Sequence, residues 1–506
     1  MNIEQIKEIE QQFLEYVKKM IAYHEAINVM YWDLRTGAPK KGVEQRSEVI
    51  GLLSSEAFKM ATSAEMETYI NTLLSEEVKN SLSDITLHTV LDCKKEYDRM
   101  KKIPLEEYTA FVTLQSQAES VWEEAKETAD FALFAPYLEK LVTATKKFVE
   151  YWGYEGNKYN TLLDMYEPGM TVEILDKVFG EVRDSIVPLL QKIEASPTKM
   201  ETEFLYKHFS KEAQEKFSID ILKQMGYDFD AGRLDETVHP FATGINPGDV
   251  RITTRYVEND FRVAIFGTIH EGGHALYEQN ISKDLVGTTL ASGTSMGIHE
   301  SQSLFNEIFV GRNKAFWKKN FDLLKSYSPG QFDNVSLDDY YRAINEVKPS
   351  LIRIEADELT YPLHVIIRYE IEKGLFNDEI EVKDLPKIWN EKYKQYLGIE
   401  PDHDGVGVLQ DVHWAGASFG YFPSYALGYM YAAQFKHALI KDIPNFDELL
   451  EKGELQPIRA WFTERVHQYG KMKQPLEILQ NATAEGLNAK YLLQYLTDKF
   501  SGIYQL

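Results

Sequence analysis

Apolar residues recur at intervals of three and four along the first part of the chain, with acids and lysines between them. This spacing is typical of an amphipathic helix, in which one side faces a core and the other faces water. The apolar positions are Ile3, Ile6, Ile9, Phe13, Val17, Met20, Ile27 and Met30. Similar patterns occur at 172–192, from 337 to the mid-340s and at 461–504, so we predict a mostly α-helical fold.

The helical pattern is interrupted between Thr237 and Tyr256. Two short extended runs, 238–241 and 250–256, flank a turn that is rich in Gly and Pro. β-Branched and aromatic residues on both sides of such a turn predict a β-hairpin. We therefore expect a small β-sheet in an otherwise helical protein, next to the segment that follows it.

No internal repeat, low-complexity tract or Gly/Ser linker divides the chain, so we expect one large helical body. The segment 414–435 has no charged side chain and is long enough to cross a bilayer, but it contains Pro423 and several Tyr, Ser and Gln residues. This polarity predicts a buried, pocket-lining segment instead. No signal peptide is evident at the N-terminus.

Charge and cysteine content narrow the class of protein further. The 506 residues include 55 Lys and Arg against 79 Asp and Glu, a net charge of −24, which repels phosphate backbones and anionic lipids. We therefore expect neither a nucleic-acid partner nor a membrane. Cys93 is the single cysteine, which excludes an intrachain disulfide and a Cys-rich zinc module and favours a reducing, cytoplasmic location.

His270, Glu271 and His274 form an HExxH sequence inside an apolar stretch that predicts a buried helix. Positions i and i+4 lie on one helical face, so both imidazoles can reach one zinc ion while Glu271 faces the water bound to it. Gly272 and Gly273 each weaken a helix by about 1 kcal/mol relative to Ala, which close approach of a substrate backbone or tight helix packing would explain. The alternative interpretation is two core histidines beside an unrelated glutamate.

A third ligand is required, because a catalytic zinc site has three protein ligands and one open position. Glu300 is the candidate, since it lies 26 residues beyond His274, after a turn-rich stretch that allows a second helix to cross the first. Its rivals are Glu278 and His299, and Glu300 could instead be a helix cap or an ion-pair partner.

Two histidines and one glutamate around zinc predict amide hydrolysis. The metal polarises the carbonyl and lowers the pKa of its water, and Glu271 takes the proton of that water and delivers it to the leaving amine. The Tyr-rich segment that follows offers hydrogen-bond donors for the oxyanion, namely His413, Tyr421 and Tyr425. Taken singly, a tyrosine in such a segment is more typical of the core than of a catalytic site.

Six motifs, in order along the chain, resemble those of the carboxypeptidase Taq family of metallocarboxypeptidases. Besides HExxH at 270–274, they are HPF at 239–241, DxRxT at 249–253, HESQ at 299–302, IRxxAD at 352–357 and GxxQDxHW at 407–414. Further similarity lies at 32–36 and 495–500. Leu304 and Phe305 follow HESQ where the family commonly has Trp, which concerns a pocket wall rather than the metal.

The resemblance implies a mostly helical, saddle-like metallopeptidase fold with a deep active-site groove, related in architecture to angiotensin-converting enzyme and neurolysin. We therefore expect residues 1–506 to form one catalytic domain with two lobes flanking the groove and the HExxH helix near 262–280. The resemblance also implies a homodimer, one zinc or cobalt ion per chain, and release of single amino acids with broad specificity from the free C-termini of peptides.

An exopeptidase needs a fixed cation for the terminal carboxylate of its substrate. Arg353 in the IRxxAD match is the first candidate, with Arg251 and His239 as helpers at the closed end of the groove. Each arginine could instead form a buried ion pair. Gln410 and Asp411 are expected either to hold substrate backbone or to orient a ligand histidine.

Two alternative functions stay open. An endo-oligopeptidase of the same helical architecture would lack the cationic anchor, and a helical scaffold would hold a metal without turnover. Glu271 argues against the scaffold, because a structural zinc site fills all four positions with protein ligands and needs no base.

Overall fold

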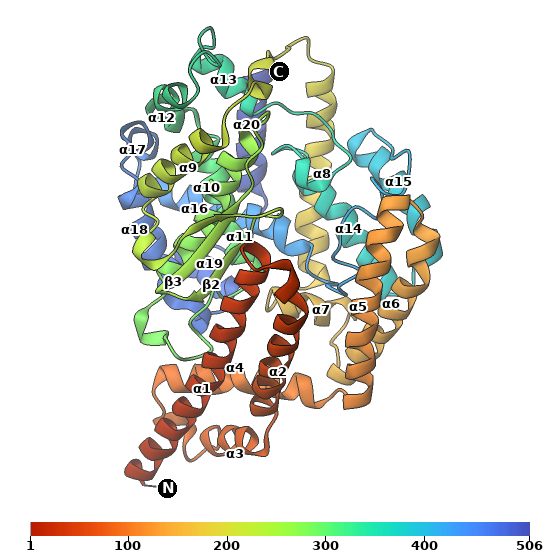
Figure 1. Cartoon of the computed structure of the whole chain (residues 1–506), viewed down its shortest axis with the longest axis vertical. Helices are drawn as coiled ribbons and strands as arrows, with labels where there is room; N and C mark the ends of the chain where they lie inside the picture. The colour runs from red at the N-terminus through yellow and green to blue at the C-terminus, as the bar shows by residue number, and fades with distance from the viewer. Residues whose placement is uncertain (1) are drawn as a thin grey trace.

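The computed structural model describes residues 2–506, and it is mostly helical as predicted (Figure 1). The chain begins with α1 (Ile3–Thr36), whose first turn is capped reciprocally by Asn2 and Gln5: each side chain accepts a hydrogen bond from the other residue's backbone N–H. Phe13 and Val17, from the predicted apolar side of this helix, are fully buried.

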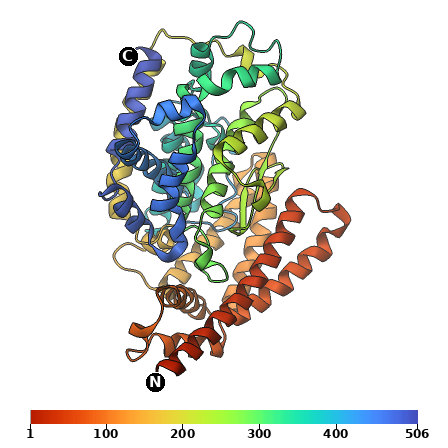
Figure 2. The same ribbon diagram turned by 90° about the vertical axis from the view of Figure 1, so that its left-hand side faces the viewer.

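The N-terminal helices have a hydrophobic core of their own. α1 packs with α3 (Ala64–Leu73) and α4 (Asp84–Lys101) around this small core. α2 (Val43–Ala61) runs back along α1 and buries only Ala57. In Figure 2, α1 and α2 form a long hairpin that leans away from the other helices.

A second group of helices lies on the right of Figure 1. It comprises α5 (Leu105–Thr128), α6 (Phe131–Trp152), α7 (Tyr159–Tyr166), α8 (Val172–Glu194), α14 (Tyr361–Phe376) and α15 (Leu385–Leu397). α8 confirms the helix predicted at 172–192, because its apolar side chains at intervals of three and four are buried.

The predicted β-sheet is confirmed, with three strands in the order β1-β3-β2. β2 (Ala242–Asn246) and β3 (Asp249–Thr254) form an antiparallel hairpin with Ala242 opposite Ile252, and β1 (Leu234–Glu236) pairs with β3 in parallel. The first extended run expected at 238–241 is wrong, since those residues precede β2. Pro240 has no N–H to donate to a ladder, so the strand begins after it.

The sheet supports the helix that carries HExxH. α10 (Arg262–Gln279) packs against β2 and β3 and also against α9 (Lys211–Met225). The following elements are α11 (Met296–Leu304), a π-helix η6 (Phe305–Gly311), α12 (Lys314–Tyr327) and α13 (Leu337–Ile344).

The C-terminal part of the chain packs on α11 through α16 (Pro423–Asp442). α16 contains most of the uncharged segment 414–435, which is largely buried as predicted. No helix among residues 2–506 is long and apolar enough to cross a membrane. The remaining helices are α17 (Phe446–Lys452), α18 (Gln456–Arg465), α19 (Pro475–Thr483) and α20 (Lys490–Tyr504).

Candidate active site

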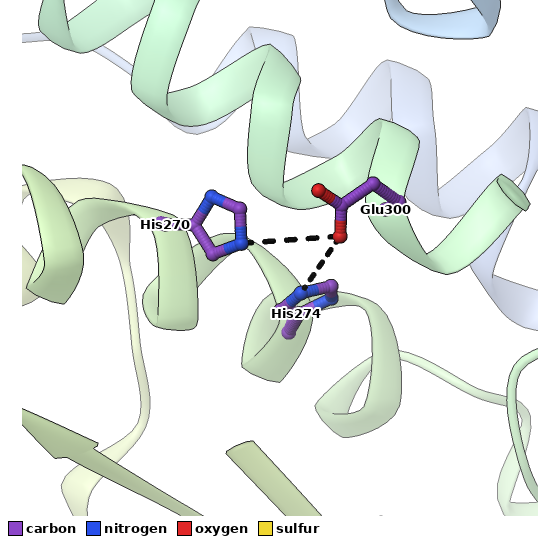
Figure 3. A group of neighbouring side chains, drawn as sticks. All are labelled: His270, His274 and Glu300. Carbon is purple, nitrogen blue, oxygen red and sulfur yellow. Dashed lines mark ion pairs between the residues drawn. The ribbon is translucent and has the colours of Figure 1, made fainter. Parts of the chain in front are cut away.

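His270 and His274 project from one side of α10, one helical turn apart (Figure 3). Their ring centroids are 5.0 Å apart and their ring planes stand at 80° to each other. Both rings are half-buried, and Glu271 is only 8% exposed. The i and i+4 spacing therefore brings both imidazoles to one place, as predicted from the sequence.

Glu300 reaches the same place from α11 (Figure 3). Its Oε2 lies 3.5 Å from His274 Nε2 and 3.9 Å from His270 Nε2. One ligand atom from each of the three residues lies within 4.8 Å of the other two, a spacing at which one ion could contact all three. Two imidazoles and one carboxylate are a donor set of catalytic zinc sites with an open position, so these residues fit a divalent metal.

Glycines allow α10, α11 and α16 to approach each other closely. A Cβ on Gly273 would lie 2.4 Å from a backbone carbonyl oxygen of α11, and a Cβ on Gly428 would lie 2.6 Å from Glu300 Cβ. A Cβ on Gly272 would lie 2.8 Å from Leu222 Cδ2 in α9. Of the two explanations for the glycines in HExxH, the structure therefore favours tight helix packing.

A carboxylate lies on the outer side of His270. His270 Nδ1 is 3.0 Å from Oε2 of Glu307 in η6, and Arg312 donates to Oε1 of the same carboxylate over 3.2 Å. Sequence reasoning missed Glu307 and Arg312. The available signal was spacing, because Glu307 follows Glu300 by seven residues, close to two helical turns.

Glu278 and His299, the two rivals of Glu300, lie behind His274. His299 Nδ1 is 2.6 Å from His274 Nδ1, and His299 Nε2 is 2.9 Å from Glu278 Oε1. Of the three candidates, Glu300 is therefore the one that approaches both histidines of HExxH.

Burial and neighbouring charges shift the pKa values of this group. Burial raises the pKa of Glu271 to about 7, against the effect of His270. Burial alone would lower the pKa of His270, but the carboxylates of Glu300 and Glu307 outweigh it and raise this pKa to about 10. The carboxylates thus favour positive charge between these side chains, and a divalent cation would supply it.

Asp411 joins two buried arginines. Arg353 in η7 (Arg353–Glu355) donates to Asp411 Oδ1 over 2.9 Å, and Arg368 of α14 donates to Oδ2 over 2.6 Å. Burial would raise the pKa of Asp411, but the two arginines hold it well below its ordinary range. Two guanidinium groups against one carboxylate leave one positive charge uncompensated within this cluster. Arg368, a charged residue in a buried stretch of α14, was not predicted.

The amide of Gln410 is occupied by protein backbone. Its Oε1 accepts a hydrogen bond from the Arg353 N–H over 2.9 Å, and its Nε2 donates to the Leu351 carbonyl over 2.9 Å. These hydrogen bonds hold the segment that carries Arg353, and a role of Gln410 toward substrate or toward a ligand histidine stays a prediction.

His413, Tyr421 and Tyr425 lie together beside Arg353. His413 Nε2 is 3.1 Å from the Tyr425 hydroxyl, and the ring centroids of Tyr421 and Tyr425 are 5.2 Å apart. The Arg353 guanidinium lies 4.8 Å from the centroid of the Tyr425 ring. Burial and the negative charge of Glu300 raise the pKa of Tyr421 to about 12, so this cluster is within electrostatic range of the group around His270.

Arg251 and His239 contact neither of these clusters among the described residues. Arg251 on β3 forms a two-pronged ion pair with Asp249, with both N–O distances at 2.7 Å. It lines a cavity of about 630 Å³ between the sheet and α1. His239 is exposed in the segment before β2.

A mostly helical protein with an HExxH helix, a glutamate from a second helix and a buried arginine cluster is a metallopeptidase by its fold and its donor set. The chain belongs to the carboxypeptidase Taq (M32) metallopeptidase family, whose sequence profile matches residues 12–500. It is therefore a metallocarboxypeptidase, a hydrolase of peptide bonds that requires a divalent metal.

Relatives match the chain over almost its full length. Carboxypeptidase 1 of Bacillus subtilis (strain 168) is 56% identical over 502 residues, which cover 99% of this chain and 100% of the relative. Thermostable carboxypeptidase 1 of Thermus thermophilus is 39% identical over 505 residues, with 98% of both chains covered. The crystal structure of an M32 carboxypeptidase from Deinococcus radiodurans R1 matches with a TM-score of 0.95 at 34% identity, covering 98% of this chain and 99% of that one.

Proposed function

We propose that this metallocarboxypeptidase holds one zinc ion between His270, His274 and Glu300 and releases single amino acids with broad specificity from free peptide C-termini. The observation that carries the proposal is the surplus positive charge of the cluster around Arg353, in contact with Tyr425. A terminal carboxylate can pair with this charge while the last peptide bond reaches the metal.

Glu271 is the general base of this proposal. A divalent cation bound here supplies the charge that polarises the scissile carbonyl and acidifies the attacking water. Glu271 takes a proton from that water and returns it to the leaving amine. A pKa of about 7 suits both steps, because the carboxyl then gains and loses a proton close to neutral pH.

Hydrogen-bond donors beside the metal stabilise the developing oxyanion. The hydroxyls of Tyr421 and Tyr425 are the proposed donors, with His413 Nε2 beside the Tyr425 hydroxyl. His413 Nδ1 is buried and has no hydrogen-bond partner among residues 2–506, so Nε2 is the ring nitrogen that faces the Tyr425 hydroxyl.

Arg353 is the proposed anchor of the substrate carboxylate, because a planar guanidinium can bind a carboxylate through two parallel hydrogen bonds. Asp411 orients its guanidinium and Gln410 its backbone. Arg251 and His239 are proposed as helpers at the closed end of the groove.

We further propose a single catalytic domain, a homodimer, a cytoplasmic location, and cobalt as a substitute for zinc. The single cysteine supports the location, and the net charge of −24 argues against nucleic-acid and membrane partners.

Mass spectrometry of one unstructured peptide, with a free or an amidated C-terminus, tests the proposal. The zinc-loaded enzyme is expected to shorten the free acid one residue at a time and to leave the amide intact. Glu271→Gln should keep its zinc and lose about 10²- to 10⁴-fold in turnover, the usual contribution of a general base.

Glu124→Gln, which changes an exposed carboxylate on α5, is the control and should cleave like the wild type. Internal cuts in both peptides would indicate an endo-oligopeptidase, and bound zinc without any cleavage would indicate a scaffold. Near-native hydrolysis by Glu271→Gln would refute the general-base assignment.

A further inference from the structure

We infer that His299 and Glu278 orient His274 through a chain of hydrogen bonds that ends at Gly293. His274 Nδ1 lies 2.6 Å from His299 Nδ1, and His299 Nε2 lies 2.9 Å from Glu278 Oε1. The backbone N–H of Gly293 donates to the same glutamate oxygen over 2.9 Å. The inference rests on the proposed function only in taking His274 as a metal ligand.

The partners in this chain determine which ring nitrogen carries a hydrogen. Glu278 Oε1 accepts from Gly293, and as a carboxylate oxygen it also accepts from His299, so His299 Nε2 carries a hydrogen. With His299 neutral, its Nδ1 accepts, and His274 Nδ1 therefore carries the hydrogen between the two rings. This leaves the lone pair of His274 on Nε2, the atom that lies 3.5 Å from Glu300 Oε2. The chain thus turns the nitrogen that can bind a metal toward the candidate site.

The surroundings of His299 restrict its rotation. A Cβ on Gly293 would lie 2.6 Å from His299 Cδ2 and 2.9 Å from Tyr277 Cε1. The Tyr277 ring packs against the His299 ring with centroids 5.2 Å apart. Close packing and hydrogen bonds at both ring nitrogens therefore hold His299 in one orientation.

The other histidine of HExxH has a different outer partner. His270 Nδ1 faces the Glu307 carboxylate directly, and Arg312 binds that carboxylate. His274 Nδ1 instead faces the imidazole of His299. The carboxylate of Glu278 lies behind His299 and contacts that ring, not the ring of His274. Partners that hydrogen-bond to the outer nitrogen of a ligating histidine commonly change metal affinity by about 10- to 100-fold. His299 and Glu278 are therefore expected to strengthen metal binding, although neither is itself a ligand.

The rate at which zinc is released into an excess of a chromogenic chelator tests the inference without any peptide. His299→Ala and Glu278→Ala are expected to release zinc about 10- to 100-fold faster than the wild type. The double variant should release zinc little faster than His299→Ala, because either change breaks the same chain. Gly293→Ala should also speed release, since its methyl group would displace the His299 ring.

His467→Ala is the matched control. The His467 ring packs on Tyr277 with centroids 5.3 Å apart and hydrogen-bonds to Gln302, outside the chain that ends at Gly293. This variant therefore loses a buried imidazole next to the same tyrosine and should release zinc at the wild-type rate. The visible absorption of the cobalt-loaded proteins, which reports ligand geometry, should change for His299→Ala and not for His467→Ala.

Wild-type zinc release with an unchanged cobalt spectrum in His299→Ala would overturn the inference, as would equally fast release from His467→Ala. If His299→Ala does not fold, as judged by thermal unfolding of the metal-free protein, Glu278→Ala and Gly293→Ala provide the same test. Failure of peptide cleavage would refute the proposed function and would leave the release rates unaffected.

Discussion

Glu167 is a buried carboxylate at the N-terminus of α11, the helix that carries Glu300. Its Oε2 accepts the backbone N–H of Gly297 over 2.8 Å, and its Oε1 accepts the Tyr431 hydroxyl over 2.9 Å. Burial raises the pKa of Glu167 from 4.5 to about 7, although these hydrogen bonds act in the opposite direction. The folded protein therefore binds a proton here that the unfolded chain releases at lower pH.

The contribution of this proton to the free energy of unfolding is fully present below about pH 4.5 and is lost as the pH rises through about 7. We expect Glu167→Gln to be about as stable as the wild type near pH 5. At pH 8 it should be more stable by up to about 3 kcal/mol, because each pKa unit corresponds to about 1.4 kcal/mol. In this variant the side-chain amide oxygen can accept the backbone N–H of Gly297, and the amide nitrogen can donate to the Tyr431 hydroxyl.

Urea unfolding between pH 5 and 8 provides the measurement. Glu4→Gln, an exposed carboxylate on α1, is the control and should parallel the wild type throughout. Parallel curves for Glu167→Gln as well would contradict the raised pKa.

The residues that meet at the site differ in how far the sequence could predict them. His270 and His274 follow from helical spacing, and Glu300 from the length of the turn between two helices. Arg368 could not be predicted in this way, because tertiary packing brings it to Asp411. The spacing of Glu307 from Glu300 places both on one side of a helix, but it does not indicate that Glu307 meets His270.

At the scale of elements, the contact between α11 and α16 sets the position of Glu300. Gly428→Ala on α16 would place a methyl group 2.6 Å from Glu300 Cβ. We expect a loss of about 1–3 kcal/mol in stability from overpacking, together with weaker zinc retention. Thermal unfolding and zinc analysis after dialysis measure the two effects.

Gly180→Ala on α8 is the matched control, because a Cβ at Gly180 meets nothing within 4 Å. It should raise stability by up to about 1 kcal/mol, as Ala favours a helix over Gly. If Gly428→Ala behaves like this control, the close approach of the two helices does not constrain Glu300.

Elements with a clear period could be predicted from the sequence, and elements made by tertiary contacts could not. β1 has three residues and is a strand because it pairs with β3. The helical pattern at 461–504 is divided by Gly470, which has a φ of +47°, and by Pro475 at the start of α19. The π-helix η6 has no signal in the apolar spacing.

At the scale of the whole molecule, the net charge of −24 acts on every peptide that approaches. We expect kcat/KM to fall with added salt for a Lys-containing peptide and to rise for the matching Glu-containing peptide, each by up to about tenfold. Raising the ionic strength from about 10 mM to about 150 mM shortens the screening length from about 30 Å to about 8 Å.

Steady-state kinetics at the two salt concentrations check this expectation. A third peptide with Gln at the same internal position should respond little. The same response from all three peptides would contradict long-range steering.

The N-terminal helices meet the main body at a boundary that contains Cys93. This residue belongs to the small core of α1, α3 and α4, and its side chain is within interaction range of Thr289 and Lys471. Burial raises the pKa of its thiol to about 12, so the thiol stays unreactive while it is enclosed. Because the chain has no second cysteine, modification by a thiol reagent in native buffer would report only the openings that expose Cys93, either at this boundary or within the small core. The protein thus carries a single internal probe for the rate at which its N-terminal helices open.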